Sequence, residues 1–185
     1  MRPFFFLNAG EYLVAAHIER EFRRAQVWMP SRDTGVDLLV SDRRRRHTVA
    51  LQVKYSKDFL VTSRPGRFGP EYQKHLRACG WWTVDRTKLR DSPADYWIFV
   101  LQGFAARSED YVIVPQGVLW RRLRSRTPTK RKVHVFLWVT EEEQCWDTRA
   151  LTRADEYSHP QRRLSQRAAR LHRLAQQLEA DRSAE

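Results

Sequence analysis

The sequence predicts an α/β fold in which helices cover a mixed β-sheet. Apolar residues at helical spacing follow Asn8, whereas several shorter apolar runs between turn residues have the length and composition of buried strands. Along the chain the expected order is a helix, strands, a helix, strands and a terminal helix. This alternation favours helices packed on a sheet over a helical bundle or an all-β barrel.

The first half of the chain is expected to contain one long helix and a series of short strands. The helix extends from Asn8 to about Ala25, with apolar residues on one face and arginines and glutamates on the other. Gly and Pro are frequent at 63–70, which predicts a loop, and 71–91 predicts one or two short helices. The expected strands are residues 26–29, 35–40 and 48–55, the last two joined by a polar turn over 41–47.

The second half of the chain also combines strands and helices. The apolar run 95–101 predicts a buried strand, and 111–114 predicts another that ends at Pro115. Residues 116–125 are expected to be helical. Alternating apolar residues over 132–139 predict a further strand.

The composition changes after Ala150, which divides the chain into an α/β domain over residues 1–150 and a basic helical appendage over 151–185. Pro160 is expected to open a helix that runs to about Arg182. Its leucines at heptad spacing would pack on the same domain or pair with a second copy of the chain in a homodimer. These leucines are Leu164, Leu171 and Leu178.

A net charge of +12, from 34 Lys and Arg against 22 Asp and Glu, indicates DNA or another polyanion as the partner. An ordinary solvated basic surface is the alternative interpretation. We expect contact with the DNA backbone rather than with base edges, because no recognition-helix or zinc-finger motif is present. The candidate DNA-binding residues are Arg43, Arg44, Arg45, Arg46, Arg121, Arg122, Arg124, Lys130, Arg131 and Lys132, together with Arg162, Arg163, Arg167, Arg170 and Arg173 of the expected terminal helix.

Cysteine usage and hydropathy bear on the cellular compartment. Cys79 and Cys145 lie far apart and form no CxxC pair, which is typical of reduced, buried thiols in a cytoplasmic protein. The apolar start of the chain is too short for a signal sequence, and no segment approaches the ~20 apolar residues that a membrane span requires. A membrane is therefore not an expected partner.

Three polar residues, Asp37, Gln52 and Lys54, stand in the two strands of the predicted hairpin. Gln52 and Lys54 share a face because side chains alternate along a strand. With Val40 opposite Val49, Asp37 lies opposite Gln52, and Lys54 is its diagonal neighbour. A shift of one residue would send Asp37 to the other face, so the prediction depends on this register.

These polar groups suit a divalent cation bound beside a phosphate. Mg²⁺ prefers oxygen ligands, which the Asp37 carboxylate, the Gln52 side chain and the Val53 carbonyl would supply. The Lys54 ammonium would hold an attacking water or offset charge on the phosphate oxygens. The alternative is structural: Asp37 caps a turn, Gln52 is a satisfied core amide and Lys54 reaches solvent.

The segments Gly35-Val36-Asp37 and Gln52-Val53-Lys54 resemble the bipartite motif of the PD-(D/E)XK nuclease superfamily, which includes restriction endonucleases and archaeal Holliday-junction resolvases. The segment from Asn8 to Ala15 looks like the helix that carries a further acid in many members, here Glu11. The resemblance implies a restriction-endonuclease-like α-β-β-β-α-β core with the acid and lysine strands central. It also implies Mg²⁺ or Mn²⁺ at Asp37, with Gln52 and Glu11 assisting and Lys54 as the catalytic lysine.

Two departures from the family pattern affect the expected metal site. The family's proline before the acid is Val36 here, and its second acid is Gln52. One negative charge fewer should weaken metal binding, and it favours a single ion or a compensating role for Glu11. Glu11 also has a structural interpretation, because Asn8 and Glu11 have the spacing of a capping box. Against this, the apolar residues that follow place Glu11 near the face that meets the sheet.

The expected function is a metal-dependent endonuclease that hydrolyses phosphodiester bonds in DNA. The resemblance suggests a role in defence, restriction or branched-DNA processing. Two alternatives stay open: a catalytically inactive nucleic-acid-binding module, and a subunit of a larger nucleoprotein assembly. Trp81 and Trp82 likewise have two interpretations, as stacking partners for bases or as core residues.

Overall fold

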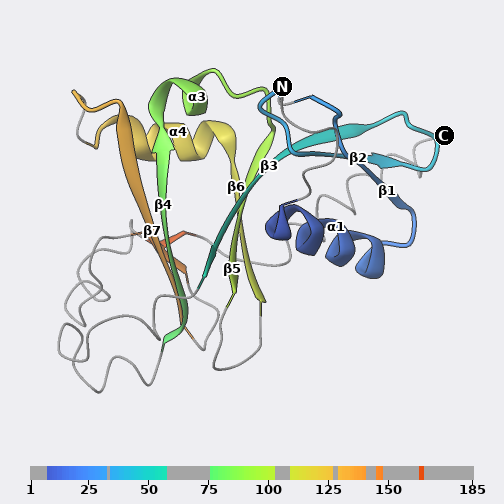
Figure 1. The fold of residues 1–185 in the computed structure, drawn as a ribbon, viewed down its shortest axis with the longest axis horizontal. Coiled ribbons are helices and arrows are strands. Elements are labelled where there is room, and N and C mark those ends of the chain that lie inside the picture. The colour runs from blue at the N-terminus through green and yellow to red at the C-terminus, as the bar shows by residue number, and fades with distance from the viewer. Residues whose placement is uncertain are drawn as a thin grey trace.

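The computed structural model describes residues 8–32, 34–57, 76–102, 109–126, 129–140, 145–147 and 163–164. Within these ranges the chain forms two β-sheets and the helices α1 (Ala9–Glu21), α3 (Arg86–Arg90) and α4 (Gln116–Arg124). α1 packs on one face of the larger sheet, and the smaller sheet and α4 pack on the other face (Figure 1).

The larger sheet confirms the expected α/β class with a mixed sheet. Its strands are β1 (Ala25–Trp28), β2 (Leu38–Asp42), β3 (Thr48–Lys57), β5 (Tyr96–Gln102) and β6 (Glu109–Pro115). They lie in the order β1-β2-β3-β5-β6, with β3 and β5 parallel and the other neighbours antiparallel. Each of these strands overlaps a segment that the sequence predicts to be a strand.

The smaller sheet corrects one prediction and confirms another. It is antiparallel and contains, in order, β4 (Leu76–Asp85), β7 (Lys132–Thr140), β8 (Cys145–Asp147) and β9 (Arg163–Leu164). β7 confirms the strand expected at 132–139. The helices expected over 71–91 are wrong for 76–85, which form β4. Trp82 and Val84 enter the core while Trp81 and Thr83 are exposed, and this alternation is that of a strand.

The expected terminal helix from Pro160 to Arg182 lies outside the described residues, except at Arg163 and Leu164. These two residues form β9, which pairs with β8, so the prediction of helix is wrong at these positions. The homodimer predicted through this helix, the boundary between residues 150 and 151 and the loop expected at 63–70 also lie outside the described ranges.

One core lies between α1 and the larger sheet. Val14 and Ile18 of α1 are buried against Leu38, Leu51 and Ile98, which come from three different strands. Side chains on this face of β2 and β3 are therefore apolar. The polar residues at alternating positions of the same strands face away from α1.

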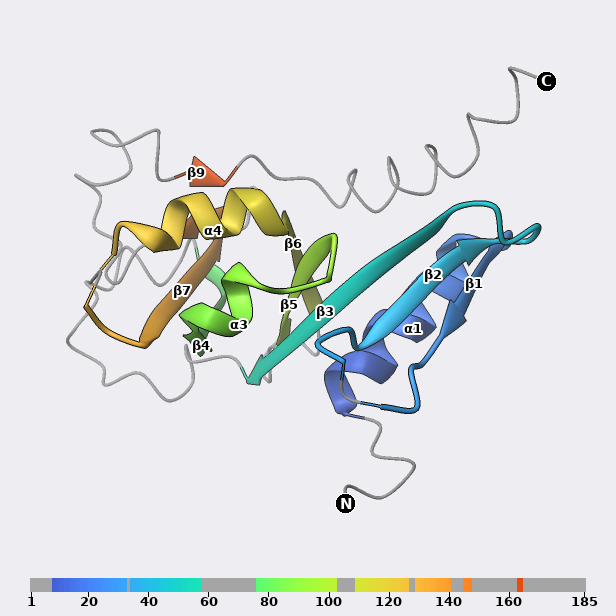
Figure 2. The ribbon, with the colours of Figure 1, turned by 90° about the horizontal axis from the view of Figure 1, so that it is seen from above.

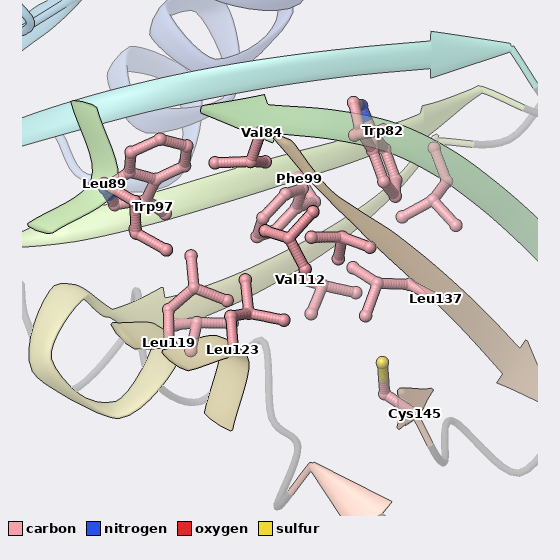
Figure 3. Close-up of a cluster of buried hydrophobic side chains, with 14 of the residues drawn as sticks. Trp82, Val84, Leu89, Trp97, Phe99, Val112, Leu119, Leu123, Leu137 and Cys145 are labelled. Atoms are coloured by element: carbon pink, nitrogen blue, oxygen red, sulfur yellow. The ribbon is translucent and has the colours of Figure 1, made fainter. Parts of the chain in front are cut away.

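A larger core joins the two sheets on the opposite face (Figure 3). Phe99 of β5 contacts Trp82 of β4 edge to face, with the ring centroids 4.9 Å apart. Leu119 and Leu123 of α4 and Leu137 of β7 are buried in the same cluster. This core fixes the smaller sheet beside the polar face of β3.

Polar contacts hold the remaining elements. The Arg126 guanidinium donates two hydrogen bonds, each 2.9 Å, to the buried Asp147 carboxylate, which ties the end of α4 to β8.

Cys79 and Cys145 are buried thiols, as expected, and burial raises the pKa of Cys145. Within the described part of the chain, no helix combines the length and the apolar character needed to cross a membrane.

α1 begins at an Asn8 cap and approaches β3 closely. Asn8 accepts a hydrogen bond from the Gly10 N–H (3.1 Å), and Glu11 accepts one from the Asn8 N–H (3.3 Å), so the expected capping box is present. A Cβ atom at Gly10 would stand 2.6 Å from the Cβ of Tyr55. The missing side chain at residue 10 therefore sets how near α1 lies to β3.

We expect Gly10→Ala to destabilise the protein by about 1–3 kcal/mol, because α1 must move away from Tyr55 to admit the methyl group. Gly117→Ala is the matched control, since a Cβ atom there meets nothing within 4 Å and lies in the first turn of α4. The control should be neutral or stabilise by up to about 1 kcal/mol. Urea unfolding measures both, and a Gly10→Ala variant as stable as the wild type would contradict the close packing.

Candidate active site at the hairpin of β2 and β3

An open cleft of about 950 Å³ lies where β3, the segment before β2 and the start of α1 meet the smaller sheet. Figure 2 shows β3 running between the group formed by α1, β1 and β2 and the group formed by α3, α4, β4 and β7. The residues on the β3 side of the cleft are Asn8, Glu11, Asp37, Gln52, Val53 and Lys54. All four predicted catalytic residues are therefore brought to one cleft.

The hairpin has the predicted register. Val40 pairs with Val49, and Leu38 pairs with Leu51. One residue further on, the Asp37 N–H donates a 2.8 Å hydrogen bond to the Leu51 carbonyl, which continues the contact between the strands. Since Leu38 and Leu51 face α1, Asp37 and its neighbours across the pair face the cleft.

The Asp37 carboxylate is bonded to β3. Its Oδ2 atom accepts hydrogen bonds from the Gln52 side-chain amide and, at 2.7 Å, from the Val53 backbone N–H. The predicted cluster of Asp37 and Gln52 is therefore present, and Asp37 bonds the neighbouring strand. Val53 lines the cleft, and its N–H is the group that contacts Asp37, whereas its carbonyl stays a predicted metal ligand.

The chain leading to Asp37 depends on a glycine. Gly35 has φ +81°, which L side chains rarely adopt, and a Cβ atom there would stand 3.3 Å from the Pro93 ring. The segment before β2 can therefore lie directly against the loop before β5. This places Gly35, Asp37 and Pro93 in the lining of the same cleft.

Lys54 lies half-buried in the same wall. Its Nζ atom is 5.6 Å from the ring centroid of Trp97, a distance at which an ammonium is attracted to an aromatic face. The Trp97 indole N–H in turn donates to the Ser92 hydroxyl at 3.3 Å. The ammonium is therefore held beside Gln52 by β3 and by the aromatic ring of the adjacent strand.

Glu11 satisfies both interpretations that the sequence leaves open. It accepts the capping hydrogen bond from Asn8, and it also lines the cleft with Asp37. The close approach of Gly10 to Tyr55 on β3 brings it there. A capping role and a position in the site are thus compatible for this residue.

The opposite wall of the cleft contains Asp85 and Lys88, which the sequence analysis missed as site residues, and Lys132, which it named as a DNA-binding candidate. Asp85 caps α3 by accepting from the Thr87 and Lys88 N–H groups at 2.9 and 3.2 Å. The hydrogen bond from Arg131 and these backbone bonds lower the pKa of Asp85. Lys88 and Lys132 line this wall as exposed cations. Lys88 can be recognised as a site residue only once Asp85 of β4 is known to pair with Lys132 of β7, because this pairing sets where α3 begins relative to the cleft.

Among the described residues, the predicted DNA-binding cations do not form one surface around the cleft, and Arg162, Arg167, Arg170 and Arg173 lie outside the described ranges. Of the described ones, Lys132 lines the cleft and Arg131 bonds Asp85 beside it. The turn between β2 and β3 holds another group, where the Arg45 guanidinium lies 4.9 Å from the Trp28 ring centroid. The residues outside the cleft lining are Arg43, Arg44, Arg45 and Arg46 in the turn, Arg121, Arg122 and Arg124 on α4, and Lys130.

The donor set suits one hard cation with few protein ligands. The described residues contain no group of three or more His, Cys, Asp and Glu side chains placed to hold a metal ion together. Asp37 and Glu11 supply carboxylates to the cleft and Gln52 supplies an amide oxygen. Mg²⁺ usually keeps several waters and takes only one or two carboxylates, so these groups are of the kind that it would use.

Comparison with known proteins finds no relative of this chain. The chain matches no protein-family model, no curated protein and no solved structure. Its functional interpretation therefore depends on the motif in the sequence and on the geometry of the cleft.

Proposed function

We propose that this chain is a metal-dependent endonuclease of the PD-(D/E)XK type that hydrolyses phosphodiester bonds in DNA. The observation that carries the proposal is the presence of Asp37, Gln52 and Lys54 on one face of the hairpin, in a cleft that Glu11 also lines. The antiparallel strands β1, β2 and β3, followed by β5 parallel to β3, agree with the strand order that the resemblance implies.

The proposed metal ligands are the Asp37 and Glu11 carboxylates and the side-chain oxygen of Gln52. A bound Mg²⁺ or Mn²⁺ ion would polarise the phosphate and lower the pKa of a coordinated water. The two hydrogen bonds to Asp37 Oδ2 orient the carboxylate before any ion arrives. Gln52 contributes no charge, so binding should be weaker than at a site with a second acid on β3.

Lys54 is the proposed catalytic lysine. Its ammonium lies on the same face as Gln52, where it can orient a water or offset negative charge that develops on the phosphate oxygens. The Trp97 ring and the Ser92 hydroxyl support it from β5 and the preceding loop. Phosphates on the opposite side of the cleft would meet Lys88 and Lys132.

A nucleic-acid-binding module without activity is the second candidate. It is favoured by the Gln52 amide, which donates a hydrogen bond to Asp37 as a satisfied structural amide does. It is also favoured because no three His, Cys, Asp or Glu side chains of the described residues are grouped to hold a metal ion. Such a module would bind DNA through the same cations. Metal-dependent cleavage separates the two candidates.

We expect Asp37→Asn and Lys54→Met each to reduce the cleavage rate by about 10²–10³-fold, because each removes one charged group from the proposed reaction centre. The assay follows supercoiled, linear and branched DNA with Mg²⁺, Mn²⁺ or EDTA. Asp42→Asn is the matched control, since Asp42 is an acid at the far end of β2 and outside the cleft lining. Cleavage that persists in EDTA or in Asp37→Asn would contradict the proposal.

Gln52→Glu should restore the second acid of the family pattern and tighten metal binding. Without divalent ions we expect a lower unfolding temperature than the wild type, because a carboxylate replaces the N–H donor beside Asp37. Mg²⁺ or Mn²⁺ should then raise the unfolding temperature of Gln52→Glu more than that of the wild type, because a lower Kd gives more stabilisation at the same ion concentration. An ion at 100 times its Kd stabilises by about 2.7 kcal/mol.

The matched control for this change is Gln52→Leu, which removes the amide without adding a charge. Its unfolding temperature should respond to divalent ions less than that of the wild type. Thermal unfolding followed by circular dichroism measures all three proteins. If divalent ions changed the unfolding temperatures of the wild type, Gln52→Glu and Gln52→Leu equally, Gln52 would not be a metal ligand.

A further inference from the structure

The outer face of β4 and β7 carries a group of aromatic rings. Trp81 pairs with Phe136 and Thr83 pairs with His134 in the register of these strands. Their side chains point away from the core, because the alternating residues Trp82, Val84, Val133 and Val135 are buried in it. Trp81 has 44% of its surface exposed, so a large aromatic ring faces solvent here.

The rings are held in fixed positions. The Trp81 and Phe136 rings are parallel to within 3°, with centroids 5.8 Å apart, and the Trp81 and His134 centroids are 5.5 Å apart. The Trp81 indole N–H donates to His134 Nδ1 at 3.1 Å, and the Thr83 hydroxyl lies 3.2 Å from the same nitrogen. Trp81, His134 and Phe136 therefore form a rigid surface, called here the aromatic platform.

The aromatic platform is continuous with the cleft. Thr83, which contacts His134, and Lys132, two residues before His134, both line the cleft. A strand rises about 3.3 Å per residue, so the platform begins roughly 7 Å from Lys132. On the same outer face Cys79 and Trp138 are buried, which confines the exposed rings to the end nearest the cleft.

The charges next to the aromatic platform favour a nucleic acid over an apolar protein surface. Lys132 and Lys88 are exposed cations that line the same cleft as Asp37, Gln52 and Lys54. Exposed planar rings beside cations are how proteins bind unpaired nucleotides, whose bases stack while the phosphates meet lysines. Bases in a continuous duplex are already stacked on one another and would not reach the rings.

We propose that Trp81, with His134 and Phe136, stacks with unpaired bases of a DNA strand that enters the cleft. The preferred substrate is then DNA with a single-stranded segment beside a duplex, such as a flap or a junction. The statement about cleavage rests on the proposed nuclease function. The statement about binding does not, because stacking needs neither metal nor Lys54.

The binding test uses fluorescently labelled oligo(dT) of about 16 nucleotides and a blunt duplex, both in EDTA, with anisotropy as the readout. Trp81→Ala should weaken oligo(dT) binding by about tenfold and leave duplex binding unchanged. Trp81→Phe should retain most of the affinity because a ring remains. Tyr12→Ala is the control, since Tyr12 is a 58% exposed ring on α1 outside the cleft lining.

Unchanged oligo(dT) affinity in Trp81→Ala would overturn the proposal, as would an equal loss for oligo(dT) and duplex. A loss in Trp81→Ala that Trp81→Phe does not restore would also overturn it, because the change would then not be one of stacking. Equal unfolding temperatures of these variants establish that the fold is intact.

The cleavage test compares a flap with a linear duplex in Mg²⁺, and Trp81→Ala should lose the preference for the flap. This design separates the two proposals. A wild type that cleaves no DNA but binds oligo(dT) through Trp81 would refute the nuclease and support the aromatic platform. Cleavage with an unchanged flap preference in Trp81→Ala would refute the platform and leave the nuclease standing.

Discussion

The register of β3 is the constraint on which both the fold and the candidate site depend. β3 pairs antiparallel with β2 and parallel with β5, so both of its edges fix the same alignment. One face gives Leu51 and Val53 to the core under α1, and the other presents Gln52 and Lys54 to the cleft. A slip of one residue would bury the amide and the ammonium and expose two apolar side chains. Formation of the core therefore also positions the polar residues.

Supports outside the hairpin hold this arrangement at its ends. The Asp95 carboxylate accepts the Ala50 N–H at 2.7 Å, and the Asp95 N–H donates to the Ala50 carbonyl at 2.8 Å, which aligns the start of β5 with β3. Gly10 allows α1 to approach β3, and Gly35 allows the chain before β2 to approach Pro93. These contacts determine which side chains can meet in the cleft.

Local patterns were sufficient to predict much of the fold and part of the site. Alternation in the hairpin predicted that Gln52 and Lys54 share a face. An assumed symmetric closure, with Val40 opposite Val49, then predicted the meeting of Asp37 and Gln52, and the structure has this register. The strand β4 could not be predicted in the same way, because its partner β7 lies almost fifty residues further along the chain. Lys88 and the aromatic platform depend on that distant pairing, so no local pattern indicated their place beside the cleft.

The order of strands has a consequence for cooperativity. Between the parallel neighbours β3 and β5 the chain passes through β4, and between the neighbours β4 and β7 it passes through β5, β6 and α4, so neither sheet is built from one continuous stretch. Phe99 of one sheet and Trp82 of the other share a core, which couples the loss of one layer to the loss of the other. The cleft between the sheets then belongs to a single unfolding unit, and cutting the chain between the layers would not release an independently folded half.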